Sequence, residues 1–223
     1  MAVISVSQAA KRLGVSERRV RALAENGDLP AEKLGGRWLV DSDRLADHSN
    51  RSSERGRPFS ALHAIGLLYL ASGEEAGWLS DYERWRLKRN PRNDLSKDLP
   101  RLRARARVGY WRAPASLIGR LTKDPGFVRS GVSAADEFAA AIHGREILDG
   151  YLDAREAKAL AHRYALARVP EIAANLVLRE IDDTRPLAGR RVMPIAVIAA
   201  DLADSSDQRT RRAGRSLMQR VQA

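Results

Sequence analysis

The chain contains no cysteine, so it can form neither a disulfide nor a cysteine-based zinc site. It also lacks long apolar runs. The longest, residues 61–71, includes a histidine and is shorter than the roughly 18 residues that suggest a membrane-spanning helix. The N-terminus has no basic segment followed by an apolar core, so we expect no secretory signal. These absences predict a cytoplasmic protein with no membrane association.

Catalytic motifs are absent as well. The four histidines form neither H-x-x-x-H nor H-E-x-x-H, and the chain has neither G-x-x-x-x-G-K nor G-x-S-x-G. Aspartates cluster at 182–183 and 201–207, near predicted turns and helix starts, where carboxylates usually act as caps. We therefore expect a protein that is not an enzyme, with no catalytic residue, no metal ion and no cofactor.

One pattern leaves an enzymatic alternative open. Arg155 and His162 lie on a predicted helix, about two turns apart on one face, where they could bind a phosphate and assist proton transfer at a 2′-hydroxyl. This spacing resembles the R-x-x-x-x-x-x-H core of HEPN ribonucleases. A ribonuclease of that kind would need a second chain to bring two Arg-His motifs together.

The N-terminal residues predict two short helices separated by a tight turn. We expect a first helix that opens at Ser7 and ends at Gly14, after which Val15 enters the core. Ser16 then caps a second helix over residues 17–26, with a glutamate in its first turn, where the helix dipole favours negative charge. The spacing is that of a helix-turn-helix.

The second helix is predicted to have one apolar and one basic side. At 100° per residue, three apolar residues share the inward side: Val20, Leu23 and Ala24. The residues expected to contact DNA are Ser16, Arg18, Arg19, Arg21 and Ala22, of which Arg18 and Ala22 point directly away from the core.

A β-hairpin is predicted to follow, because two strand-like runs, 32–34 and 37–40, flank a pair of glycines able to take positive φ. Trp38 is expected to pack on the helices, and a third short helix begins at 41–42. The hairpin residues expected along a phosphate backbone are Lys33, Gly36 and Arg37.

This order of features resembles the excisionase-like branch of the MerR-type winged helix-turn-helix families. The pattern AA-x-x-LGVS-x-x-x-V-x-x-L, then G-x-LP and GG-R-W, is found within residues 4–48. The resemblance implies double-stranded DNA as the partner. The second helix carries three arginines where the family often has polar or aromatic readers, which favours phosphate contact over base reading. A small packed module that binds only protein is the alternative.

Positive charge is concentrated in one later segment. Residues 84–129 hold 14 basic and 3 acidic side chains, so the net charge of this segment is +11, the same as that of the whole chain. Such a strip would add salt-dependent affinity for phosphates. The alternative is a solvated face of helices over a core of Leu87, Leu95, Leu99 and Leu102. The residues expected to make secondary phosphate contacts are Arg86, Arg89, Arg101, Arg103, Arg105 and Arg107.

The predicted fold is mainly α with small β elements. A winged helix-turn-helix domain over 1–48 and a linker over 49–58 precede a larger α-rich α+β domain over 59–223, with a sub-boundary near 130–145. Helices are expected over 59–72, 81–89, 95–107, 114–123, 153–164, 195–202 and 208–221, and strands over 110–112, 147–152 and 175–181.

The larger domain resembles the C-terminal parts of actinobacterial AbiEi-type antitoxins, which accompany nucleotidyltransferase-like toxins. This resemblance implies a cognate toxin protein as a partner. It rests on scattered residues rather than on a catalytic signature: Trp78-Leu79-Ser80, Leu99-Pro100 with the arginines after it, Val128-Arg129-Ser130-Gly131, Asn175 to Arg179 and Ala200 to Gly214.

Together these features predict a sequence-specific DNA-binding transcriptional regulator, with antitoxin autorepression as the favoured form. The alternative is an excisionase-type recombination directionality factor, although the long second domain argues against it. Because one recognition helix covers few base pairs, we expect a homodimer on an inverted repeat. Seven apolar residues could supply the pairing surface or be buried in their own core: Leu176, Leu178, Ile195, Ile198, Leu202, Leu217 and Val221.

Overall fold

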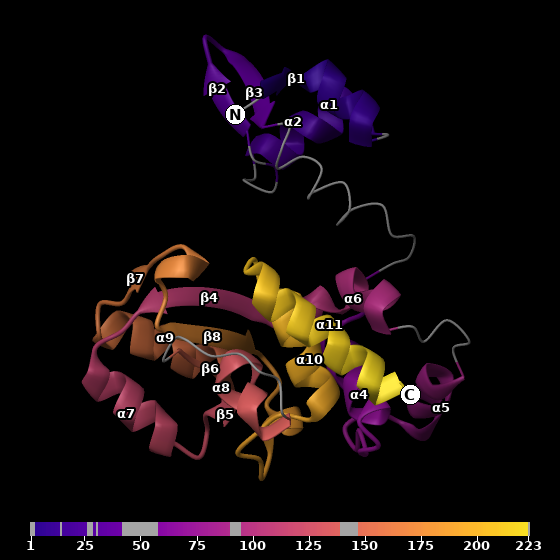
Figure 1. The fold of residues 1–223 in the computed structure, drawn as a ribbon, viewed down its shortest axis with the longest axis vertical. Coiled ribbons are helices and arrows are strands. Elements are labelled where there is room, and N and C mark those ends of the chain that lie inside the picture. Colours follow the sequence, from indigo (N-terminus) through magenta and orange to yellow (C-terminus); the bar gives the residue numbers. More distant parts are fainter. Residues whose placement is uncertain are drawn as a thin grey trace. The chain divides into compact units, whose positions relative to one another are not determined.

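The chain divides into two units, Met1–Gly56 and Arg57–Ala223 (Figure 1). Each unit has its own hydrophobic core. The predicted third helix after Asp41 and the predicted linker up to residue 57 lie outside the described residues. The computed structural model describes residues 3–13, 15–25, 29, 31–41, 58–89, 95–138 and 147–222.

The first unit packs two helices on a three-stranded antiparallel sheet. The sequence predicted only the hairpin, but a short N-terminal strand joins it, with Ile4 opposite Val40. The strand order is β1-β3-β2. The elements are β1 (Val3–Ser5), α1 (Val6–Leu13), α2 (Glu17–Glu25), β2 (Ala31–Leu34) and β3 (Arg37–Asp41).

Helix α1 begins at Val6, and its cap lies two residues earlier than predicted, because Ser5 rather than Ser7 caps it. The Gln8 amide donates to Ser5 Oγ at 3.2 Å, and the Ser5 amide donates to Gln8 Oε1 at 3.0 Å. This reciprocal pair is a capping box. The expectation that Val15 enters the core is wrong, since its side chain is 39% exposed. Leu29, only 2% exposed, belongs to that core instead.

The second unit is built on one mixed five-stranded sheet. Strand β6 is parallel to β8, and the other pairs are antiparallel. Because β4 pairs with β8, the predicted sub-boundary near 130–145 does not divide this unit. The strands are β4 (Arg107–Arg112), β5 (Val128–Arg129), β6 (Leu148–Asp153), β7 (Ala167–Arg168) and β8 (Leu176–Ile181), in the order β5-β6-β8-β4-β7.

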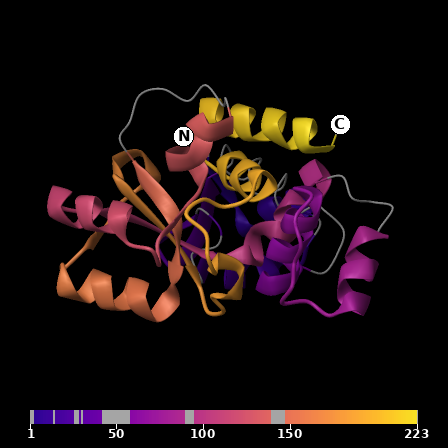
Figure 2. The ribbon, with the colours of Figure 1, turned by 90° about the horizontal axis from the view of Figure 1, so that it is seen from below.

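Helices cover both faces of this sheet. Helices α7 and α9 lie on one face, and α10 and α11 lie on the other (Figure 2). The helices are α4 (Ala61–Ala71), α5 (Asp81–Lys88), α6 (Leu95–Leu102), α7 (Ala115–Lys123), α8 (Gly131–Ala134), α9 (Ala154–Arg163), α10 (Ile195–Ala203) and α11 (Gln208–Gln222). Short 3₁₀ helices are η1 (Arg103–Arg105), η2 (Ala135–Phe138), η3 (Glu171–Ala173) and η4 (Arg185–Leu187).

Most of the predicted helices of this unit are confirmed, and side-chain caps explain the starts of three of them, whereas α7 and α10 begin after prolines without a side-chain cap. Ser60, Ser80 and Asp153 accept backbone hydrogen bonds at the first turns of α4, α5 and α9. The helix predicted over 95–107 is too long, since α6 ends at Leu102 and Arg107 already belongs to β4.

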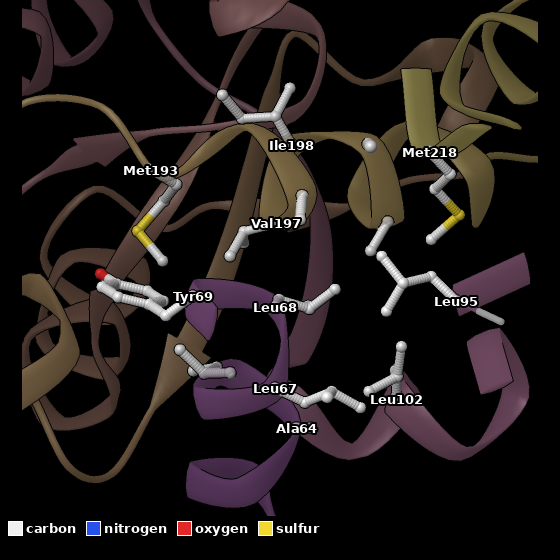
Figure 3. Packing of buried hydrophobic residues seen from close by; sticks show 14 of the residues in the cluster. Ala64, Leu67, Leu68, Tyr69, Leu95, Leu102, Met193, Val197, Ile198 and Met218 are labelled. Atoms are coloured by element: carbon white, nitrogen blue, oxygen red, sulfur yellow. The ribbon is translucent and has the colours of Figure 1, made fainter. Parts of the chain in front are cut away.

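The main core forms where α4 meets α6, α10 and α11 (Figure 3). Helix α4 is apolar almost all round, as expected of a buried helix. Of the seven apolar residues considered for dimer pairing, five are buried in the unit's own core: Leu176, Leu178, Ile198, Leu202 and Leu217. Ile195 and Val221 are partly buried against it. These residues therefore do not form a pairing surface.

Opposite α7 and α9, the sheet carries a buried ionic network instead of a purely apolar layer. Arg179 of β8 donates to both carboxylate oxygens of Asp149, at 2.7 and 3.0 Å, and contacts Asp201 of α10 at 3.1 Å. Arg105 reaches the same Asp201 at 2.7 Å and Asp204 at 2.8 Å. Each of these buried charges therefore has an opposite partner, as burial requires.

The network shifts the ionisation of its members. Burial raises the pKa of the Asp149 carboxyl, and the Arg179 guanidinium counteracts part of that rise. Burial also works to lower the pKa of Arg105, but the nearby carboxylates of Asp201 and Asp204 together raise it above its ordinary value. Tyr151 donates its hydroxyl to Asp201 at 3.1 Å, and burial keeps its pKa above the ordinary value.

Replacing Gly214 with alanine is expected to lower the free energy of unfolding by about 1–3 kcal/mol. A Cβ on this α11 residue would lie 2.7 Å from Leu202 C and 2.8 Å from Ala199 O, backbone atoms that cannot rotate away. The control is Gly119→Ala on the exposed side of α7, where a Cβ meets open space. The free energy of unfolding of this control variant should rise by roughly 0.5–1 kcal/mol, because alanine favours a helix more than glycine does. Urea denaturation compares the two, and equal effects would refute close packing of α10 on α11.

Candidate nucleic-acid interface

The helix-turn-helix is held together by the apolar sides of α1 and α2. Ala9 and Ala10 of α1 pack with Val20 of α2, and all three are buried. The turn between them is fixed by two hydrogen bonds. The Val15 amide donates to the Ala10 carbonyl at 3.1 Å, and Ser16 Oγ accepts from the Arg19 amide at 3.3 Å, which confirms Ser16 as the cap of α2.

The outer side of α2 is basic and open to solvent. Arg18, Arg19 and Arg21 are all exposed, while Ala22 is half-buried rather than pointing directly outward. Arg21 forms an ion pair with Glu17 one turn earlier, at 2.7 Å. Among the described residues Arg18 and Arg19 form no ion pair, so their guanidinium groups are available to an external anion.

The hairpin has the two-glycine turn that the sequence predicted. Gly35 and Gly36 have φ of 55° and 78°, the conformation of a tight turn that matches strand twist. Trp38 packs on the core as expected. Lys33, however, lies directly opposite Trp38, with its ammonium 5.9 Å from the ring centroid.

Lys33 therefore lies on the same face of the hairpin as Trp38. Cross-strand partners lie on the same side of a sheet. The side chain of Arg37, which was also expected to contact phosphate, lies outside the described residues. Leu34 is 60% exposed, an apolar residue at the hairpin tip that sequence reasoning missed. The sequence did contain a signal for this position: Leu34 follows Lys33 in the same strand, and successive side chains of a strand point to opposite faces. Lys33 is exposed and remains a candidate for phosphate contact.

The six arginines expected to form a secondary phosphate strip lie in different surroundings. The expectation for Arg105 is wrong, because this residue is 3% exposed and paired with buried carboxylates. Arg103 pairs with Asp204 at 3.0 Å, and Arg107 donates to both oxygens of Asp182 at 2.8 Å. Their partners are 75 or more positions distant, so local charge counting could not reveal them.

The remaining members of the strip lie nearer the surface. Arg101 is half-buried, pairs with Asp98 at 2.6 Å and stacks over the ring of Phe59. Arg86 is exposed on α5 and Arg89 is exposed at the C-cap of this helix, where its guanidinium lies 5.0 Å from the ring centroid of Trp85. The core proposed beneath the strip is confirmed, since all four of its members are buried: Leu87, Leu95, Leu99 and Leu102.

The acidic clusters are occupied by other partners. Asp183 binds Arg185, and Asp207 caps α11 by accepting from the Thr210 amide at 2.7 Å. The described residues contain no group of three or more potential ligands that could hold a metal ion.

No helix in the same part of the chain is long and apolar enough to cross a membrane. Arg155 and His162, the ribonuclease alternative, are both exposed on α9.

Residues 3–51 match the family model of a helix-turn-helix domain. This match spans α1, α2 and the hairpin, so the first unit is a helix-turn-helix domain, a class that binds DNA. The second unit that follows is a separate α+β unit. No curated protein matches the chain, and no solved structure does.

Proposed function

We propose that the protein is a sequence-specific transcriptional repressor acting in the cytoplasm, with no catalytic step of its own. The observation that carries this proposal is the exposed pair Arg18 and Arg19 on the second helix of the helix-turn-helix. In such motifs the second helix enters the major groove and its N-terminal residues contact base edges. Both arginines lie in the first turn of α2.

Repression at its own promoter tests this proposal. A reporter driven by the DNA upstream of the gene should fall when the protein is expressed. The same reporter should recover when Arg18 and Arg19 are both replaced by alanine at equal protein level. Activation of the reporter, or no change with the wild-type chain, would contradict repression.

The favoured form of this role is an antitoxin that represses its own operon. The resemblance of the second region to AbiEi-type antitoxins supports it, and it assigns a nucleotidyltransferase-type toxin as the partner. Coexpression with the protein of the adjacent reading frame tests it. Rescue of growth from that protein supports the antitoxin role, whereas an integrase in that position favours the excisionase alternative.

The repressor is proposed to act as a homodimer on an inverted repeat, because a single helix reads too few base pairs to be specific in a genome. Footprinting of the full chain should protect two half-sites about one helical turn apart. Sizing should give twice the monomer mass of 24.7 kDa. A monomer that protects one half-site as well as a repeat would contradict this arrangement.

Arg86 and Arg89 are expected to add non-specific affinity. Each phosphate contact contributes about −0.9 to the slope of log affinity against log salt, so neutralising both with glutamine should reduce the slope by up to roughly 2. Arg107→Gln serves as the control, because its guanidinium is already bound to Asp182. An unchanged slope in the double variant would show that these arginines belong to a solvated face that makes no contact with phosphates.

A further inference from the structure

A cavity of about 600 Å³ lies in the second unit, between the sheet and the turn that joins α10 to α11. Its apolar walls include Val108 of β4, Val177 of β8 and Leu202 of α10. Ligand pockets commonly measure roughly 300–1,000 Å³ and combine apolar walls with a few polar groups. The cavity is therefore large enough for a small organic molecule.

Exposed apolar side chains gather at this cavity. In the described part of the second unit, the exposed large hydrophobic residues are Tyr82, Trp85, Val108 and Ile172. Two of these four, Val108 at 39% and Ile172 at 71% exposure, line the cavity. A bound molecule would shield apolar surface that now faces solvent, which favours binding of a ligand with an apolar body.

The charges around the cavity favour a cation. Its lining holds five carboxylates, four of which have an arginine near them: Asp149, Asp201, Asp204 and Asp207. The fifth, Glu171, accepts hydrogen bonds from two neutral donors, Ser205 Oγ and the Ser206 amide, and it lies beside the neutral hydroxyl of Tyr110. Within the described residues Glu171 forms no ion pair. One carboxylate thus remains without a paired cation.

Glu171 is also held in position. The Ser206 amide lies 3.1 and 3.0 Å from its two carboxylate oxygens, which ties η3 to the turn after α10. On the other side of that turn, Arg211 donates to the carbonyl oxygens of Ser205 and Ser206. A carboxylate fixed in this way can bind a ligand without ordering its own side chain first.

An anion fits this cavity less well. Two arginines belong to the lining: Arg179 is already paired with two carboxylates, and Arg209 lies beside the carboxylate of Asp207. The N-terminus of α11, which would otherwise attract a negative charge, is capped by Asp207. Burial and the nearby carboxylate of Glu171 raise the pKa of Tyr110 in the same lining to about 12.

We propose that this cavity binds a small organic monocation, a primary amine on an apolar or aromatic body, with its ammonium group on Glu171. The apolar body would lie against Val108, Val177 and Leu202. This site goes beyond DNA binding and can be tested without DNA.

Calorimetry on the full chain at pH 7 tests the proposal with three probes of similar size: 2-phenylethylamine, 2-phenylethanol and 3-phenylpropionate. The amine should bind about tenfold more tightly than the alcohol, and the carboxylate should bind more weakly than either. Glu171→Gln should abolish the preference for the amine over the alcohol. Glu75→Gln, an exposed glutamate outside the cavity, should leave it unchanged.

A second variant tests the location. Val108→Phe places a larger side chain, well tolerated in strands, at a partly exposed position of the cavity wall and should weaken binding of all three probes. Four results would overturn the proposal. These are tighter binding of the carboxylate than of the amine, an intact amine preference in Glu171→Gln, undiminished binding in Val108→Phe, and no binding of the amine up to about 10 mM.

Discussion

Replacing Arg18 or Arg19 with alanine is expected to weaken operator binding by about 1–3 kcal/mol each, and to relax specificity at the base pair each arginine reads. Both side chains are exposed on the first turn of α2 and form no ion pair among the described residues. Their removal should leave the fold intact, since the core of this unit is built from other residues. Gel shifts at fixed salt measure the loss.

The control for this series is Arg215→Ala, which removes an exposed arginine from α11 in the second unit. It should leave operator affinity unchanged. Lys33→Ala should weaken binding to all sequences alike, because a phosphate contact carries no base information. Undiminished affinity in the Arg18, Arg19 and Lys33 variants alike would contradict the assignment of α2 and the hairpin as the DNA-contacting surface.

Replacing Asp201 with alanine is expected to cost about 3–5 kcal/mol of unfolding free energy. This carboxylate is 2% exposed and contacts the guanidinium groups of both Arg105 and Arg179. Its loss leaves each of these two buried guanidinium groups with a single carboxylate partner, Asp204 for Arg105 and Asp149 for Arg179. It also removes the acceptors for Tyr151 and Ser130.

Asp183→Ala provides the matched surface control, because Asp183 pairs with Arg185 outside the core. Exposed ion pairs contribute about 0–1 kcal/mol, so this variant should be close to wild type. Urea denaturation followed by circular dichroism compares the two. A loss below about 1 kcal/mol for Asp201→Ala would contradict a structural role for the buried network.

Local signals were enough to predict much of both units. Ser16, Ser80 and Asp153 start helices through hydrogen bonds to residues two or three positions later, so their sequence neighbours reveal them. The Gly35-Gly36 turn is similarly local, because two adjacent glycines can take positive φ. For the same reason α2 was predicted nearly to its residue bounds.

The errors arose where distant partners decide the structure. Arg105 looked like a surface cation, yet its carboxylate partner Asp201 lies 96 positions later. Strand β1 has only three residues and pairs with β3. No local sequence pattern predicts this pairing. The apolar residues near the C-terminus fitted either a dimer surface or the unit's own core equally well. Only their packing against α4 and the sheet shows that they belong to the core.

We propose that the helix-turn-helix reads a specific DNA sequence. In vitro selection from random duplex DNA with the full chain tests it most directly. We expect enrichment of one motif arranged as an inverted repeat, which is lost when Arg18 and Arg19 are replaced by alanine in the same selection. Recovery of unenriched sequences by folded wild-type protein, or the same motif from the double variant, would contradict the claim.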